Sequence, residues 1–196
     1  MHRSDLKELH YIAAIENVVS ILKHGILSHN RAVRVPHLSI AMQEMQDRRA
    51  HVVVPGGRKL HDYVNLYICA RNPMLFKRLS LIDQICVLRV DTGVLDIPGV
   101  VVTDSNASGD YVRFASAPHG LLFVDQERTF AEYWTDPDPL EYYRKKAAKC
   151  AEVLIPDRVP PEFIIGVVVG TTFAKTALDS LETQLDAQIH RHLFFR

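Results

Sequence analysis

A single acidic residue interrupts what otherwise reads as a buried β-strand, the run Ala151-Glu152-Val153-Leu154-Ile155. Successive residues of a strand face opposite sides of a sheet, so Glu152 and Leu154 share one face while Val153 and Ile155 share the other. Burying an unpaired carboxylate is costly, and such an acid normally meets a cation, a hydroxyl or a ligand. An ion pair at a strand edge and a functional acid both satisfy this requirement, and other segments must decide between them.

The remaining periodicity predicts an α+β fold. The N-terminal half is expected to be largely helical, with helices over residues 15–23 and 40–49 and with Met42, Met45 and Arg49 on one side of the second helix. Short runs rich in β-branched residues then predict strands, and two further helices are expected near the end. Strands do not alternate regularly with helices, which argues against a doubly wound parallel sheet. No linker divides the chain, so we expect one domain over residues 1–196. The expected strands cover 64–70, 84–90, 100–103, 121–124, 151–155 and 163–169, and the late helices cover 140–149 and 174–188.

Composition narrows the class of protein. Lys plus Arg and Asp plus Glu both number 23, so any nucleic-acid binding must use a local basic patch. Cys69, Cys86 and Cys150 stand singly in apolar runs without metal-ligand spacing, and free thiols fit a reducing compartment. We therefore expect a cytoplasmic protein that binds no metal. No apolar run is long enough to cross a membrane, and no signal peptide is recognisable, so we expect no membrane partner.

Familiar nucleotide-binding motifs are absent: the chain has neither GxGxxG nor a Walker sequence. Polar residues stand instead at the edges of apolar elements, among them His10, Tyr67 and Glu152. Each has an ordinary explanation when taken singly. The adjacent Arg48 and Arg49, for example, suit the negative end of a helix dipole.

Taken together, short motifs in a specific order and spacing resemble the DarT family, the toxins of DarT–DarG toxin–antitoxin systems. The resemblance covers nearly the whole chain, from about Leu9 to Val169. The motifs that carry it are Leu9-His10-Tyr11-Ile12 with Asn17, Ile21 to Ser28, Gln46-Asp47-Arg48-Arg49, Leu60 to Tyr67, Arg71 to Leu75, Thr103 to Ala107, Trp134 and Ala151 to Pro156. Two departures stand out: Asn65 occupies a position where the family often has Pro, and Ile68-Cys69-Ala70 replaces a more aromatic run.

The resemblance implies an ADP-ribosyltransferase fold with a split central β-sheet and an NAD-binding cleft, of the His–Tyr–Glu type. It also implies transfer of ADP-ribose from NAD⁺, as co-substrate, to a nucleobase in single-stranded DNA. His10 would bind the adenosine ribose, Tyr67 would stack on the nicotinamide, and Glu152 would be the catalytic acid. Further cofactor-binding residues implied by the resemblance are Tyr11, Ile12, Asn17, Leu27, Ser28, Arg31 and Arg48.

Chemistry makes sense of these residue types. Cleaving the nicotinamide–ribose bond develops positive charge on the sugar, which a carboxylate such as Glu152 can stabilise. A base nitrogen must lose its proton, and Glu152, Arg48 or His119 are candidates to share that work. Arginine stays charged at neutral pH, so the arginine of this site is more plausible as an electrostatic clamp than as a base. Between the adjacent arginines we prefer Arg48 to Arg49 as the catalytic one.

Contact with DNA is expected from a local surface rather than from net charge. Basic and polar side chains near the expected site supply it, although the lysines near residue 145 are equally well explained as one solvated face of a helix. The candidates for DNA binding are Arg34, Arg71, Met74, Asn106, Arg113, Lys145, Lys146 and Lys149.

Other functions remain open at this point. They are a protein-directed ADP-ribosyltransferase, an NAD-dependent RNA 2′-phosphotransferase, which does not depend on a catalytic Glu, and a non-enzymatic nucleic-acid-binding module. The resemblance further implies a macrodomain antitoxin of the DarG type as a partner, and we expect the chain to be a monomer. The family modifies thymine or guanine, and the short chain gives a slight preference for guanine.

Overall fold

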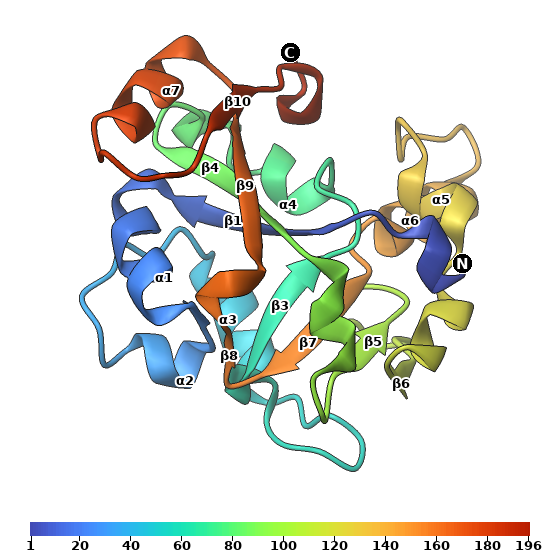
Figure 1. Cartoon of the computed structure of the whole chain (residues 1–196). Coiled ribbons are helices and arrows are strands. Elements are labelled where there is room, and N and C mark those ends of the chain that lie inside the picture. Colours follow the sequence, from blue (N-terminus) through green and yellow to red (C-terminus); the bar gives the residue numbers. More distant parts are fainter.

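The computed structural model describes all 196 residues and has an eight-stranded mixed sheet at its centre (Figure 1). The strands of this sheet lie in the order β10-β9-β4-β1-β3-β7-β5-β6, and β2 pairs with β8 in a separate two-stranded sheet. The strands are β1 (Leu9–Ala14), β2 (Ile26–Leu27), β3 (Tyr63–Tyr67), β4 (Ile85–Val90), β5 (Val101–Thr103), β6 (Phe114–Ser116), β7 (Glu152–Pro156), β8 (Arg158–Val159), β9 (Ile164–Val169) and β10 (Ala187–Ile189).

The sheet is split at its middle. Six residue pairs join β1 to β4, and five join β3 to β7. Between β1 and β3 the only registered pair is His10 with Tyr67. The two halves of the sheet therefore diverge from that pair, and the space between the diverging strands is available to a ligand. The α+β class and the split sheet expected from the sequence are both confirmed.

Strand β7 alternates as its sequence predicts. Val153 and Ile155 belong to the largest apolar cluster of the protein, whereas Leu154 packs in a smaller cluster with Val54 and Leu60. Glu152 lies on the same side of the strand as Leu154 and has no exposed surface. A carboxylate is thus held on the inside of the molecule, where it requires a partner.

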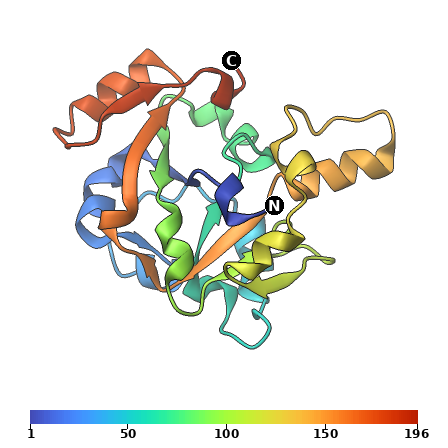
Figure 2. The ribbon, with the colours of Figure 1, turned by 45° about the vertical axis from the view of Figure 1, so that its right-hand side comes forward.

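Most helices lie close to their expected positions. Helix α1 ends at Gly25, whose φ of +83° and whose approach to the Val159 carbonyl leave no room for a Cβ atom. Figure 2 shows α6 carried on a long loop at the side of the molecule. The helices are α1 (Val18–His24), α2 (His29–Ala32), α3 (Gln43–Ala50), α4 (Pro73–Phe76), α5 (Gln126–Phe130), α6 (Pro139–Ala148) and α7 (Thr172–Asp179).

Three expectations about secondary structure are wrong. The N-terminal half is not largely helical, because β1 is an inner strand of the sheet. The six residues of β1 show neither the period of a strand nor that of a helix in their apolar positions. Residues 119–123 form a 3-10 turn rather than a strand. The helix expected over 174–188 ends at Asp179, and the chain then forms β10 parallel to β9. Helix α7 also buries Ala174 and Leu178, so only one side of it is at the surface.

No helix of the protein is both long enough and apolar enough to span a lipid bilayer.

Candidate active site

Four adjacent strands align their polar residues in one row across the sheet. His10 of β1 stands opposite Tyr67 of β3, Tyr67 opposite Glu152 of β7, and Glu152 opposite Thr103 of β5. Residues in register on neighbouring strands point to the same face. The structure therefore brings together the His, Tyr and Glu that the sequence placed far apart along the chain.

Glu152 finds its partner in Arg49, which comes from the C-terminal turn of α3. One guanidinium nitrogen of Arg49 donates to both carboxylate oxygens of Glu152, at 3.1 and 3.2 Å. Both side chains are buried, with 0% of Glu152 and 8% of Arg49 exposed. Burial raises the pKa of the Glu152 carboxyl above its ordinary value of 4.5, and the Arg49 charge only partly offsets the rise. The site thus holds a carboxyl group that is a stronger base than an exposed glutamate.

Beside this pair lies a cleft that we call the histidine cleft. It opens where β1 and β3 diverge and has a volume of about 980 Å³ including its open mouth. His29 and His61 stack at its wall with ring centroids 4.1 Å apart, and burial lowers the pKa of both. No Asp or Glu lines it. Its residues are Tyr11 to Ala14, Asn17, Leu27, His29, Ala32, His37 to Ala41, Gln46, Arg49, Leu60, His61, Tyr63 to Asn65, Tyr67, Met74 and Arg78.

Unsatisfied polar atoms converge on the histidine cleft. Three buried side-chain atoms of the protein make no hydrogen bond: Ser28 Oγ, His61 Nε2 and Arg78 Nε. His61 and Arg78 line the cleft, and Ser28 lies between two residues that line it, Leu27 and His29. Buried polar groups are nearly always paired, so their shared location indicates a polar ligand.

A second cleft, which we call the methionine cleft, lies among α3, α4, α6 and the loop after β5. It is lined by Met42, Met45, Arg48, Pro73, Met74, Lys77, Asn106, Ser108, Gly109, Lys146 and Cys150, and it also contains no acid. Methionine side chains adapt to flat or irregular ligands, and the three cations favour an anionic one. Met74 lines both clefts, so a single side chain separates them at that point.

Two pairs of adjacent basic residues divide between the clefts. In α3, Arg48 lines the methionine cleft and Arg49 the histidine cleft. Immediately after α4, Lys77 lines the methionine cleft and Arg78 the histidine cleft. The arginine that contacts Glu152 is therefore Arg49 and not the preferred Arg48, whose side chain is 62% exposed and pairs with Glu44 at 2.8 Å. An α-helix rotates by about 100° per residue, so the side chains of adjacent residues point in different directions.

The same geometry corrects the stripe expected on α3. Met42, Met45 and Arg48 face the methionine cleft together, while Arg49 turns toward Glu152. The expected stripe of Met42, Met45 and Arg49 is therefore wrong in one residue, because Arg48 and not Arg49 lies on the same side as the two methionines.

The residues expected to bind the cofactor lie mostly around the histidine cleft. Tyr11, Ile12, Asn17, Leu27 and Tyr67 line it, and Ser28 adjoins it. The remaining three lie elsewhere. The ring nitrogens of His10 face Glu8 at 3.1 Å and the Tyr67 carbonyl at 3.4 Å. Arg31 pairs with Asp157 at 3.2 Å, and Arg48 lies in the methionine cleft. Tyr67 is buried, and burial together with the Glu152 charge holds the pKa of its hydroxyl well above the ordinary value.

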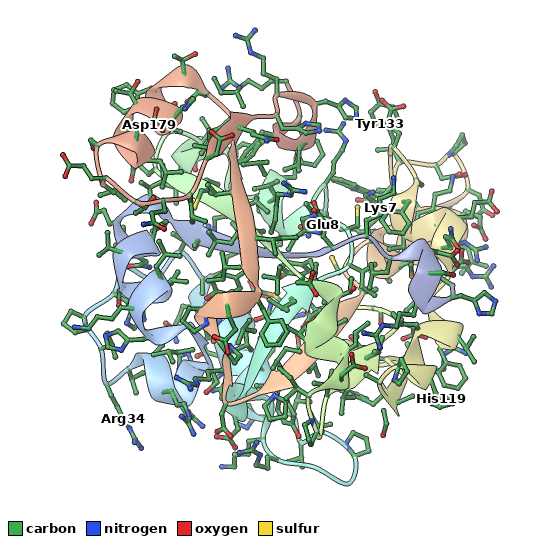
Figure 3. All side chains as sticks on the ribbon, in the orientation of Figure 1. Lys7, Glu8, Arg34, His119, Tyr133 and Asp179 are labelled. Atoms are coloured by element: carbon green, nitrogen blue, oxygen red, sulfur yellow. The ribbon has the colours of Figure 1, made fainter.

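The residues expected to bind DNA separate into two groups. Met74, Asn106 and Lys146 line the methionine cleft. Arg34 is exposed on the far side of the molecule from α6 (Figure 3), Arg113 pairs with Asp104, Lys145 pairs with Asp136, and Arg71 donates to the carbonyls of Glu132 and His192.

Two expected site residues lie outside both clefts. Lys149 is wrong as a surface contact: it is buried, and its Nζ donates to the carbonyls of Ala131 and Thr129 at 2.5 and 3.3 Å. This ammonium group anchors the loop before α6 and cannot reach a phosphate. His119 is exposed at the start of the 3-10 turn after β6 and lines neither cleft, and its role as a proton carrier stays a prediction (Figure 3).

Sequence reasoning missed His29, His61, Arg78 and Lys77 as cleft residues. One signal was present: Met45 stands three residues before Arg48, and Met74 stands three residues before Lys77. No three His, Cys, Asp or Glu side chains are grouped so that they could hold a metal ion.

Comparisons with known proteins agree with this geometry. The profile of the family "ssDNA thymidine ADP-ribosyltransferase, DarT" matches residues 10–195. A DNA ADP-ribosyl transferase of Thermus sp. (strain 2.9) is 33% identical over 173 residues, covering 82% of this chain and 80% of that protein. A DNA ADP-ribosyl transferase–DNA ADP-ribosyl glycohydrolase fusion protein of Thermosipho africanus is 29% identical, and the chain spans only 42% of its length.

Solved structures show the same fold. Thermus sp. 2.9 DarT in complex with ADP-ribosylated ssDNA superimposes with a TM-score of 0.82 and 27% identity, covering 98% of both chains. The same Thermus protein in complex with carba-NAD⁺ gives a TM-score of 0.78 with 26% identity, covering 96% of this chain and 98% of that one. The family profile covers nearly the whole sequence. The chain belongs to the DarT family of single-stranded DNA ADP-ribosyltransferases.

Proposed function

We propose that this protein transfers ADP-ribose from NAD⁺ to a base of single-stranded DNA and releases nicotinamide. The histidine cleft holds NAD⁺, and the methionine cleft holds the acceptor strand. The observation that carries the proposal is the buried Arg49–Glu152 pair, whose neighbours reach both clefts. Arg49 and Tyr67 line the first, and Cys150, two residues before Glu152, lines the second.

NAD⁺ suits the histidine cleft for electrostatic and steric reasons. The cleft presents two arginines and three histidines without any acid, which matches the diphosphate of a dinucleotide. Arg78 Nε and His61 Nε2 await a hydrogen-bond partner there, and Arg78 is charged at every physiological pH. We assign these two side chains to the diphosphate. Tyr67 provides an aromatic wall beside Glu152 against which the nicotinamide ring stacks.

Glu152 performs the chemistry. The bond between ribose C1′ and the nicotinamide nitrogen breaks, its electron pair leaves with nicotinamide, and the carboxylate stabilises the positive sugar. The base nitrogen then forms the new bond to C1′ and gives its proton to Glu152. The raised pKa of Glu152 suits a group that must accept a proton near neutral pH. Arg49 keeps enough of this carboxyl ionised and fixes its orientation through two hydrogen bonds.

The acceptor strand enters from the methionine cleft. Arg48, Lys77 and Lys146 hold phosphates there, and Met42 and Met45 pack against the base. Glu152 has no exposed surface, so the flexible side chain of Met74 must move aside as the two substrates meet. A base paired in a duplex is stacked and cannot enter such a cleft, which explains the requirement for a single strand.

We propose thymidine as the acceptor, following the description of the matched family, in place of the guanine suggested by chain length alone. The glycohydrolase half of the Thermosipho fusion protein supports a macrodomain antitoxin of the DarG type as the partner of this chain. The fusion of a transferase with a glycohydrolase that acts on ADP-ribosylated DNA fits a toxin joined to its antitoxin, and we assign the toxin role to this chain.

Mass spectrometry of four single-stranded oligonucleotides tests the function. Each carries a different central base between fixed flanks that contain no thymidine, and each is incubated with the protein and NAD⁺. We expect a mass increase of one ADP-ribose on the thymidine oligonucleotide, and none on its duplex or with Glu152→Gln. Transfer to RNA or to protein alone would contradict the DNA-directed role, and an acceptor other than thymidine would correct the base assignment.

A further inference from the structure

Three segments distant in sequence meet at the end of α4 in an aromatic cluster in which Phe76 is exposed and Trp134 and Phe195 are half-buried. Phe76, Trp134 and Phe195 contact one another edge to face, with ring centroids 5.1 to 5.7 Å apart. Figure 1 shows the C-terminal turn lying over α4. Half of Phe76 is exposed, and the neighbouring Tyr133 is also at the surface (Figure 3). We refer to Phe76, Trp134 and Phe195 as the aromatic platform.

Arg71 assembles this platform. Its guanidinium lies over the Phe195 ring, 4.0 Å from the centroid, and it donates to the carbonyls of His192 and Glu132 at 2.5 and 3.4 Å. Phe195 itself adopts φ of +63°, a left-handed conformation that bulky residues rarely accept. Strain of this kind persists where surrounding contacts enforce it, and it often marks a functional position. The rings are therefore held in place rather than left by chance at the surface.

The platform continues the methionine cleft. Pro73, Met74 and Lys77 of the α4 region line that cleft, and Phe76 belongs to the same four-residue helix. Met74 and Phe195 also pack against one apolar cluster of the core. A strand whose acceptor base occupies the methionine cleft thus meets Lys77 and then exposed aromatic rings. Aromatic rings beside a cation are what unpaired bases bind.

We propose that the aromatic platform is a second nucleic-acid subsite, which stacks bases on one side of the modified nucleotide in single-stranded DNA. This inference rests on the proposed function and extends it: the cleft selects the base that is modified, while the platform sets how much flanking strand is bound. Because stacking tolerates every base, the subsite strengthens the binding of longer strands whatever their flanking sequence.

The test compares oligonucleotides of two lengths. A minimal oligonucleotide fills only the methionine cleft, and longer ones extend it on the 5′ side alone or on the 3′ side alone. For Phe76→Ala we expect KM to rise roughly tenfold for one of the two extended substrates, since stacking is typically worth about that factor per base. In the same variant, KM for the minimal oligonucleotide, KM for NAD⁺ and kcat should not change. Phe76→Tyr should restore the wild-type value.

The matched control is Phe173→Ala, which removes a ring that is 69% exposed on α7, outside the platform. A fluorescent 2-aminopurine in the extension provides a direct reading, because stacking quenches it; we expect quenching with the wild type and Phe173→Ala but not with Phe76→Ala. Wild-type KM values for both extended substrates in Phe76→Ala would overturn the platform, as would a loss only in binding to a protein partner. Failure of the wild type to modify even the minimal substrate would instead refute the proposed function.

Discussion

The two clefts beside Glu152 are built from the same kinds of segment and yet differ in character. Both take one residue from an adjacent basic pair in α3 and one from a second pair after α4. In the histidine cleft Arg49 is buried, and the half-buried Arg78 and His61 keep Nε and Nε2 buried without a hydrogen-bond partner, whereas Arg48 and Lys77 of the methionine cleft are exposed. Buried, unpaired donors suit a ligand that is enclosed, and exposed cations suit a flexible polyanion that passes over the surface.

The adjacent residues Arg48 and Arg49 therefore have different roles and are not interchangeable. Arg49 is part of a buried ion pair, and its loss leaves a carboxylate without a partner in a dry environment. Arg48 pairs only with Glu44 on an exposed turn of helix, where ion pairs contribute little to stability. Substitutions can therefore separate the chemistry from the binding of each substrate.

The largest effect is expected for Glu152→Gln. Loss of the proton acceptor and of the charge that stabilises the sugar should reduce kcat for transfer by about 10²–10⁴-fold. Glutamine keeps the size of the side chain and an oxygen that accepts from Arg49, although not the charge, so the melting temperature should fall less than in Glu152→Ala. Glu152→Ala is the poorer variant because it removes both the charge and the hydrogen-bond acceptor. Transfer by Glu152→Gln within a few-fold of the wild-type rate would remove Glu152 from the mechanism.

A large, pH-dependent effect is expected for Arg49→Leu. Breaking a buried pair typically costs about 3–5 kcal/mol, but here Glu152 can relieve the cost by binding a proton. Without Arg49 the pKa of Glu152 rises further, so the native state binds a proton that the unfolded chain releases near 4.5. The loss of unfolding free energy in Arg49→Leu should accordingly be small near that pH. It should grow as the pH rises and become constant above the pKa of Glu152 in the folded variant.

Denaturant titrations of Arg49→Leu across pH measure this dependence. The acid limb of the activity profile should move to higher pH in the same variant, because more Glu152 is protonated. The double substitution Arg49→Leu with Glu152→Leu should recover stability without activity. A destabilisation that is the same at every pH would show that the pair does not set the pKa of Glu152.

A smaller effect is expected for Arg48→Gln. If Arg48 contacts one phosphate of the strand, the slope of log Kd against log salt should fall by about 0.7, the value for single strands, while KM for NAD⁺ is unchanged. Arg34→Gln is the matched control, since Arg34 is exposed and lines neither cleft. A lower slope in the control alone would mean that DNA passes over another side of the molecule.

Much of the fold follows from local sequence. The alternation of Ala151 to Ile155 and the left-handed Gly25 were predictable because each depends on neighbours in the chain. The inner strand β1 was not, because its short run shows neither period and only pairing with β4 and β3 decides its conformation.

The site was predictable in its residue types and less so in its arrangement. Motif order placed His10, Tyr67 and Glu152, and the sheet register then aligned them. The choice between Arg48 and Arg49 depends on how α3 is rotated against β7, which no spacing within one helix reveals. Lys149 looked like part of a basic surface, but tertiary packing gives it carbonyl partners from a distant loop.

Whether the two clefts hold different substrates is measured by crossed kinetics of variants at the neighbours Lys77 and Arg78. KM for NAD⁺ and KM for a thymidine-containing single strand are measured in Lys77→Gln and in Arg78→Gln. Loss of a hydrogen bond to a charged group is worth about 1.5–3 kcal/mol, so Arg78→Gln should raise KM for NAD⁺ roughly ten- to a hundredfold and leave KM for DNA unchanged. Lys77→Gln should raise only KM for DNA, by a few-fold. The assignment of one substrate to each cleft would be contradicted if both variants raised KM for the same substrate. It would also be contradicted if Arg78→Gln raised only KM for DNA and Lys77→Gln only KM for NAD⁺.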